Sequence, residues 1–361
     1  MRGDIEQQRD LVVTVTPEEL VPRDHPIRVI KKMADEALKR LGPKLEGLYS
    51  EKGRPSIPPE MLLKSQILIA LYTVRSERLF CERLQYDFLF RWFLDLPGVG
   101  TAFDATTFSK NRQRLLEAEI FEDFFAEVLE QARRRHLLSD EHFTVDGTLI
   151  EANASLKSFR PRKGSGGPPD AGGRNADVDF RGQKRRNDTH GSKTDPDAKL
   201  YRKGNGQPAQ LCYLGNVLME NRNGLCVGTS VTQADGHGER SAALEMIDAL
   251  AGDRRITLAG DKGYDTRDFI ENLRLRNVTP HVAQHTKRRK SAIDRRTTRH
   301  DGYTVSQRIR KRVEEIFGWG KTIGGLAKTR FRGLARVAAH VLVVMTAYNL
   351  VRIARIQTST A

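Results

Sequence analysis

Two aspartates lie where the chain pattern could place oxygen ligands for a metal ion. Asp146 falls inside HFTVDGTLIEA (residues 142–152), a segment with the composition and alternation of a strand. Asp261 directly follows RRITLAG (residues 254–260), a second predicted strand, and begins a Lys-Gly-Tyr-Asp turn. Ligands in α/β sheets collect at the carboxyl ends of strands. Because the chain has 46 acidic residues and most acidic side chains are simply solvated, neither aspartate alone identifies a site.

A third carboxylate is expected on the amphipathic helix predicted within YTVSQRIRKRVEEIFGWGK (residues 303–321). Apolar residues recur there at helical spacing and predict a buried stripe made of Val305, Ile309, Val313, Ile316 and Phe317. Gln307, Arg310 and Glu314 follow at intervals of three and four residues, so they share one face beside the stripe. Lys321 extends that face if the helix continues so far.

The periodicity does not choose between two neighbouring glutamates of this helix. Glu315 flanks the apolar stripe on the opposite side from Glu314, at about the same angular distance. A basic amphipathic helix with a surface Arg310–Glu314 ion pair would explain the pattern without any chemistry. The residues therefore predict a helix here and leave the glutamate open.

The elements that would position these carboxylates follow the order β-β-β-α-β-α-β-α. The predicted strands are residues 142–152, 211–221, 224–233, 254–260 and 278–284. The predicted helices are residues 239–250, 266–276, about 304–317, and a long helix from about residue 332. Three strands followed by αβ units is the order of a ribonuclease-H-like mixed sheet, so we expect an α/β fold of that class. This analogy concerns the fold and does not itself give a function.

The N-terminal part of the chain reads as mostly helical. A long helix is predicted over residues 104–136, with Thr107, Lys110, Asn111 and Arg114 near its start. Such a polar and basic N-terminus would suit entry into a DNA groove. An ordinary surface helix of an all-α domain fits the same residues, so this pattern alone does not establish DNA binding.

The formal net charge of +15 is concentrated in two segments. Residues 157–203 hold 13 Lys and Arg against 6 Asp and Glu, a net charge of +7. Residues 286–336 hold 16 against 4, a net charge of +12. The first segment is rich in Gly, Pro, Asn, Asp and Ser without apolar periodicity, so it is predicted to be a flexible basic insertion. Two basic segments favour a nucleic-acid partner over solvated surface alone.

Other classes of protein are not expected. The N-terminus has no apolar stretch behind a basic start, and three cysteines without a CxxC pair indicate a reduced, cytoplasmic protein. The longest apolar run, Val337–Val351, contains His340, Thr346 and Asn349. It is predicted to be a buried packing helix, and no membrane partner is expected.

Three motifs together give the chain a resemblance to a known family. TVDGT surrounds Asp146, AGDKGYD surrounds Asp261, and the third pattern reads Gln307-(2)-Arg310-(3)-Glu314-(6)-Lys321. The chain resembles the DDE transposases of bacterial insertion sequences, in the group named after insertion sequence five. That family's pattern selects Glu314 over Glu315 and often has Tyr where Gln307 stands. Residues 22–38 and 328–350 are also similar, so the resemblance covers nearly the whole chain.

The resemblance implies a two-part enzyme. It implies an N-terminal helical DNA-binding domain over residues 1–136 and a ribonuclease-H-like catalytic domain over 137–361, with the basic insertion at 157–203. Asp146, Asp261 and Glu314 would bind a pair of Mg²⁺ or Mn²⁺ ions, which prefer oxygen ligands. The enzyme would bind the terminal inverted repeats of an element, hydrolyse them to 3′-OH ends and join these to target DNA by transesterification. Synapsis of two ends implies a homodimer on double-stranded DNA.

The resemblance and the charge pattern also suggest residues that contact DNA. Arg310 and Lys321 would contact phosphate near the cleavage point, with Lys262 as a weaker candidate. Trp319 would stack on an exposed base, although a Trp in this position more often packs in a core. The basic run at residues 287–290 would add phosphate contacts from Lys287, Arg288, Arg289 and Lys290.

Two alternatives have different consequences. A DNA-binding repressor derived from a transposase would bind without cutting, although an intact acidic triad argues against it. A ribonuclease-H-like nuclease would hydrolyse DNA without joining strands. Cleavage and strand-joining assays separate these three hypotheses.

Overall fold

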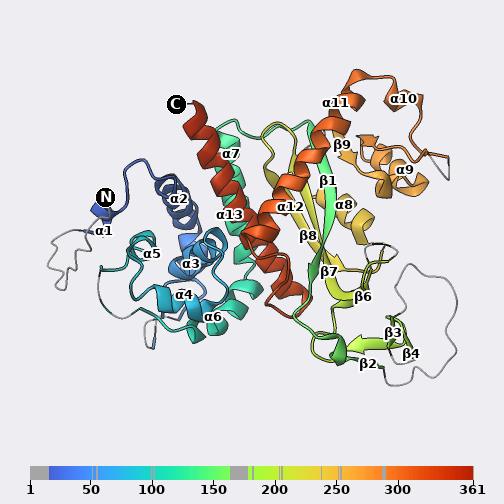
Figure 1. Cartoon of the computed structure of the whole chain (residues 1–361). Coiled ribbons are helices and arrows are strands. Elements are labelled where there is room, and N and C mark those ends of the chain that lie inside the picture. Colours follow the sequence, from blue (N-terminus) through green and yellow to red (C-terminus); the bar gives the residue numbers. More distant parts are fainter. Residues whose placement is uncertain are drawn as a thin grey trace, which may run out of the picture.

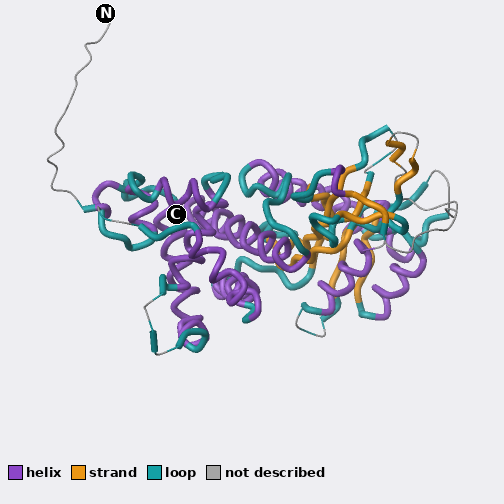
Figure 2. Tube along the Cα trace, turned by 90° about the horizontal axis from the view of Figure 1, so that it is seen from below, coloured by secondary structure: helices purple, strands orange, loops and turns teal. Residues whose placement is uncertain are grey.

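The computed structural model describes residues 16–360, except residues 51, 54–55, 99, 101, 163–177, 181–182, 203, 205, 237, 251, 253 and 287–289. A helical half, formed by the chain up to residue 134, lies beside a half built on a mixed β-sheet (Figure 1). The same division is visible from below, where the strands gather at one end of the molecule (Figure 2).

The main sheet has the strand order β10-β9-β1-β7, and both β6 and β8 pair with β7. β9 and β10 run parallel to β1, whereas β7 is antiparallel to β1, β6 and β8. This arrangement confirms the predicted ribonuclease-H-like mixed sheet. The bounds are β1 His142–Glu151, β6 Lys199–Tyr201, β7 Gln210–Glu220, β8 Cys226–Gln233, β9 Ile256–Gly260 and β10 Val278–Val282.

Helices cover both faces of this sheet. Side chains alternate between faces along a strand, and β7 shows the consequence: Leu218 packs with α8 (Gly238–Asp248) and α9 (Arg267–Leu275), while Val217 and Met219 belong to the core on the other face. That second core includes α12 (Val313–Thr322) and α13 (Leu334–Thr360). Since both faces are covered, every residue of β7 after Gln210 is buried.

The C-terminal helix α13 joins the two halves. It packs against α2, α3 and α7 of the helical half and against β8 of the sheet, so one hydrophobic core runs through both (Figure 1). By length and composition alone, Leu334–Thr358 could cross a membrane, but 78% of its most apolar window is buried inside the structure. The expectation of a buried packing helix is therefore confirmed. The remaining helical half comprises α1 Pro17–Leu20, α2 Ile27–Glu46, α3 Pro59–Leu71, α4 Glu77–Arg83, α5 Phe88–Phe93, α6 Thr106–Glu117 and α7 Ile120–Arg134.

The prediction of one long helix over residues 104–136 is wrong. The chain forms α6 and α7, separated at Glu119, whose φ of 55° lies in the left-handed region and interrupts the helical hydrogen bonds. Asn111, expected to be available at the helix start, is buried and donates to the Thr107 carbonyl oxygen. Lys110 of the same helix remains exposed.

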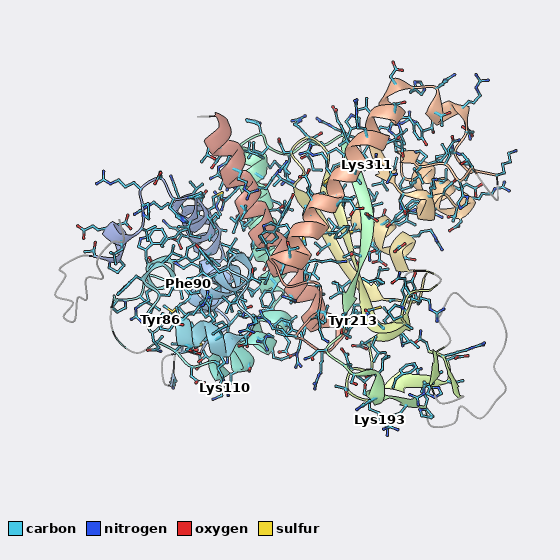
Figure 3. All side chains as sticks on the ribbon, in the orientation of Figure 1. Tyr86, Phe90, Lys110, Lys193, Tyr213 and Lys311 are labelled. Atoms are coloured by element: carbon cyan, nitrogen blue, oxygen red, sulfur yellow. The ribbon has the colours of Figure 1, made fainter. Side chains whose placement is uncertain are left out.

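The described parts of segment 157–203 are also more regular than predicted. They contain β2 Phe159–Pro161, β3 Val178–Phe180, β4 Gln183–Arg185 and β5 His190–Ser192, and β6 adds to the main sheet. A buried aspartate anchors the segment: Asp195 accepts a hydrogen bond of 2.6 Å from the Tyr213 hydroxyl of β7, which lies within the sheet half (Figure 3). Residues 163–177 and 181–182 lie outside the described residues. Strands of three residues are too short to show an apolar period, so the sequence pattern did not reveal them.

Candidate active site

Asp146 lies in the middle of β1, opposite Val217 of β7. Its Oδ1 accepts a hydrogen bond of 2.8 Å from the N–H of Gly147. Burial is the largest of several effects that together raise the pKa of the Asp146 carboxyl to about 7: the hydrogen bond from Gly147 opposes the rise, and the carboxylates of Asp261, Glu314 and Glu239 add to it. Asp146 is thus a partly buried carboxyl surrounded by negative charge.

Strand register brings Asp261 to the level of Asp146. Thr144 of β1 pairs in parallel with Ala259 of β9, and each aspartate follows two residues later. Asp261 is exposed and begins the 3₁₀ turn η2 (Lys262–Tyr264), where its Oδ1 accepts from the N–H of Gly263 at 2.7 Å. The register therefore places the two aspartates level with each other on neighbouring strands.

The helix that carries Glu314 is interrupted where the sequence predicted continuity. α11 (Asp301–Ile309) passes through a 3₁₀ turn, η3 (Arg310–Arg312), into α12 (Val313–Thr322). A 3₁₀ turn rotates the chain more per residue than an α-helix, which changes which side faces inward. Val305, predicted in the buried stripe, is 41% exposed, and Ser306 is buried instead. Val313, Ile316 and Phe317 are buried as predicted.

The two glutamates have different surroundings. Both are exposed on the first turn of α12, which packs against β1 and α13. Glu314 is among the carboxylates that raise the pKa of Asp146. Glu315 forms an ion pair of 3.6 Å with Arg352 of α13. The charge of Glu314 therefore acts on Asp146, whereas that of Glu315 is engaged with α13.

Gln307 connects α11 to the sheet. Its Nε2 donates to the carbonyl oxygen of His281 in β10 at 2.5 Å, and its Oε1 accepts from Arg310 Nε at 3.0 Å. Gln307 thus fixes the direction of the Arg310 guanidinium. Lys321 continues α12 past Gly318, as the motif spacing requires, and is partly buried.

The other predicted DNA contacts lie in several environments. Lys262 is exposed in η2, beside Asp261, and Lys290 is exposed after the basic run. Lys287, Arg288 and Arg289 lie outside the described residues. Trp319 is partly buried, with its ring edge-on to Tyr348 of α13 at a centroid distance of 5.7 Å. That contact favours the packing role for this indole.

Comparisons with known proteins agree with the motifs. The description "Transposase domain (DUF772)" matches residues 15–114, and "Transposase DDE domain" matches residues 137–350. The chain belongs to the DDE transposase family. No curated protein matches its sequence.

Solved structures resemble this transposase only distantly. The piggyBac transposase synaptic complex with hairpin DNA has 8% identity, a TM-score of 0.43, and coverage of 92% of this chain and 76% of that one. The Mos1 strand transfer complex has 11% identity, a TM-score of 0.21, and coverage of 82% and 78%. A Mos1 paired end complex with Mn has 10% identity, a TM-score of 0.21, and coverage of 91% and 87%. These likenesses are too weak to assign residues in this chain.

One carboxylate beside Asp146 was missed by sequence reasoning. Glu239 lies in the first turn of α8, and a Cβ atom built on Gly147 would be 3.1 Å from its Oε1. Only the absence of a side chain at Gly147 allows this approach. The sequence predicts a helix over residues 239–250, which includes Glu239, but nothing in the pattern shows that this helix begins beside Asp146.

Asp265, the last residue of the AGDKGYD motif, was also missed. It is 2% exposed and accepts hydrogen bonds from the N–H groups of His285, at 2.7 Å, and Ala292, at 2.9 Å. These two residues flank the basic run at 287–290. Asp265 therefore ties both ends of that run to the turn that carries Asp261.

The donor set suits a hard divalent cation. Asp146, Asp261, Glu314 and Glu239 offer only carboxylate oxygens, the ligands that Mg²⁺ and Mn²⁺ prefer. Within the described ranges, no three acidic, His or Cys side chains already stand close enough together to hold an ion. Burial first, and the neighbouring carboxylates next, raise the pKa of Asp146, and the positive charge of a bound cation would oppose both effects. The donor chemistry of these four residues therefore fits the metal.

Proposed function

We propose that this transposase cuts the DNA ends of its element by metal-dependent hydrolysis and joins the resulting 3′-OH ends to target DNA by transesterification. Two observations carry the proposal: Asp261 follows β9 at the level of Asp146 in β1, and the charge of Glu314 on α12 acts on the Asp146 carboxyl. Carboxylates brought together from three separate elements repel one another, which costs folding free energy. A purely structural role does not explain this cost, whereas metal binding for phosphoryl transfer does.

Asp146, Asp261 and Glu314 would hold two Mg²⁺ or Mn²⁺ ions, with Glu239 as a fourth oxygen ligand. Bound there, the ions supply positive charge to the attacking and leaving oxygens of an in-line displacement. Arg310, oriented by Gln307, would hold a phosphate oxygen next to the reacting bond. The chain's own side chains thus position the phosphodiester, and no covalent protein intermediate is needed.

The partner in this proposal is double-stranded DNA, first the terminal inverted repeats and then the target. Residues 1–136 would bind the element ends, and a homodimer would bring two ends together. Lys321, Lys262 and the basic run at 287–290 would add phosphate contacts. Trp319 would reach a base only by leaving its contact with Tyr348.

The first experiment separates the site residues from their neighbour. Asp146→Asn, Asp261→Asn and Glu314→Gln are expected to abolish Mg²⁺-dependent cleavage of terminal-repeat DNA while leaving DNA binding largely intact. Glu315→Gln is the matched control and should cleave nearly as well as the wild type, since that side chain pairs with Arg352. Retained cleavage in the three site variants would overturn the assignment, as would equal loss in the control.

The alternatives are separated by the products. Joined products recovered from a target plasmid would exclude a nuclease that only hydrolyses DNA. Binding without any Mg²⁺- or Mn²⁺-dependent cleavage by the wild type would support a repressor and refute the proposed activity.

The basic run has its own test. Neutralising Lys287, Arg288, Arg289 and Lys290 together should weaken binding to all DNA sequences alike and flatten its salt dependence, by about one unit of slope for each lost phosphate contact. A changed sequence preference would show instead that this run reads bases.

A further inference from the structure

A cavity of about 200 Å³ lies where the helical half meets the loop between α12 and α13. The residues after α3 form one wall, including Val74 and Arg75, and the loop contributes Gly324, Lys328 and Arg330. The lining contains three cationic side chains and, among the described residues, no Asp or Glu. Lys328 and Arg330 come from the KTRFRG stretch at residues 328–333, and neither is one of the carboxylate-site residues.

Two buried nitrogen atoms of the lining have no hydrogen-bond partner in the part of the chain that the structure describes. Arg330 donates through Nη1 to the Val74 carbonyl oxygen at 3.2 Å, but its buried Nε has no hydrogen-bond partner within the described residues. His340 of α13 is 8% exposed, and its buried Nδ1 likewise has none there. An unsatisfied buried polar group costs about 1–3 kcal/mol, so such atoms indicate a water molecule or an ion.

Charge favours an anion over water alone. Burial, with the nearby Arg330 and Arg112 guanidinium groups, lowers the pKa of His340 to about 3, so the imidazole is neutral beside a positive cluster. Two carboxylates stand near these cationic side chains, but neither lines the cavity. Each already has a partner: Glu77 pairs with Arg112, and Glu151 pairs with Lys328 at 2.6 Å.

The competing explanation is that these cations stabilise helix ends. α3 and α12 both end at the cavity, and carbonyl groups at a helix C-terminus attract positive charge. This accounts for the Arg330 bond to Val74, but it leaves Arg330 Nε and His340 Nδ1 without an acceptor or donor. A planar guanidinium with an open N–H edge is suited to binding phosphate oxygens.

Two adjacent glycines of the loop line this cavity. A Cβ atom on Gly324 would lie 2.3 Å from Val344 Cγ1, so the loop rests directly on α13. Gly325 follows with a φ of +77° and open space around its Cβ position. A side chain at residue 324 would push the loop away from α13, so this glycine allows the close contact of the loop with one wall.

We propose that this cavity binds a phosphate group, and that in the working transposase this is a phosphate of the DNA backbone. The choice of DNA as the source rests on the proposed function, whereas the phosphate site itself does not. A bound backbone phosphate would touch the helical half and the α12–α13 loop together, and would link DNA binding to the element that carries Glu314.

The first test uses inorganic phosphate and the full chain. At constant ionic strength, phosphate in place of chloride should raise the melting temperature of the wild type and of the control Arg78→Gln, an exposed arginine on α4 outside the cavity. The rise should be smaller in Arg75→Gln and Arg330→Gln. Arg75 is exposed, so its substitution keeps the test valid if the Arg330 variant does not fold.

The second test measures the salt dependence of DNA binding. If the phosphate comes from DNA, Arg75→Gln and Arg330→Gln should each reduce the slope of log K against log salt by about one, while Arg78→Gln leaves it unchanged. Stabilisation by phosphate without a slope change would support the site with free phosphate as its source. If phosphate does not stabilise the wild type more than the two cavity variants, and the salt slope does not change either, the proposal is overturned and the cations only stabilise helix ends. Both tests measure binding, so failure of the cleavage chemistry would be recognised separately.

Discussion

Replacing Asp146 by asparagine is expected to stabilise the metal-free protein above pH 7. Burial, followed by the charges of Asp261, Glu314 and Glu239, raises the pKa of this carboxyl from 3.8 to about 7. A carboxyl with a higher pKa in the folded than in the unfolded state contributes stability below pH 4, and that contribution is lost as the pH rises to 7. At about 1.4 kcal/mol per pH unit, the full effect is about 4 kcal/mol. Partial solvent contact reduces the expected gain to about 2 kcal/mol.

Urea unfolding in EDTA at pH 5 and pH 8 measures this effect. The free energy of unfolding of Asp146→Asn should exceed that of the wild type by more at pH 8 than at pH 5. Asp24 is an exposed carboxylate remote from the site, so Asp24→Asn should unfold like the wild type at both pH values. Adding Mg²⁺ at pH 8 should stabilise the wild type and not the Asp146 variant. A difference that is independent of pH would refute the argument from charge repulsion, and equal stabilisation of both proteins by Mg²⁺ would refute the role of Asp146 in binding it.

Three further substitutions test single contacts. Glu239→Gln removes a charge next to Asp146, so calorimetry should show Mn²⁺ binding weakened about tenfold, a loss of about 1.4 kcal/mol; unchanged affinity would remove Glu239 from the ligand set. Gln307→Ala releases the Arg310 side chain and should slow cleavage about tenfold with DNA affinity preserved, whereas an unchanged rate would show that Arg310 needs no orientation. Asp265→Asn weakens two buried hydrogen bonds and should lower the free energy of unfolding in urea by about 1–3 kcal/mol; a difference below 0.5 kcal/mol, roughly the effect of a neutral surface change, would contradict that anchoring.

Sequence patterns predicted the elements that carry their own periodicity. β1 and β9 were predicted within two residues of their observed bounds, and parallel register then places Asp261 level with Asp146. Glu239 could not be found in this way, because its approach to Asp146 depends on a glycine across the site and on the tertiary position of α8. The misplacement of Val305 has a related cause: the 3₁₀ turn at residues 310–312 changes the helical phase, and no residue in the stripe signals it.

The two family matches divide the chain near residues 114 and 137, but its hydrophobic core does not follow that division. Ala339 and Val343 of α13 face Leu62 and Phe121 of the helical half, and the same helix supports α12 beneath Glu314. A fragment that begins at residue 137 would expose this side of α13 to water, at a cost of about 25 cal/mol per Å² of apolar surface. We therefore expect the fragment to aggregate or to lose its fixed tertiary structure, as measured by size-exclusion chromatography and near-ultraviolet circular dichroism beside the full chain. A monomeric fragment with a native spectrum and wild-type Mg²⁺ affinity would show that the catalytic half does not depend on residues 1–136. Otherwise the position of Glu314 is set partly by the helical half, because α13 is the common support of both.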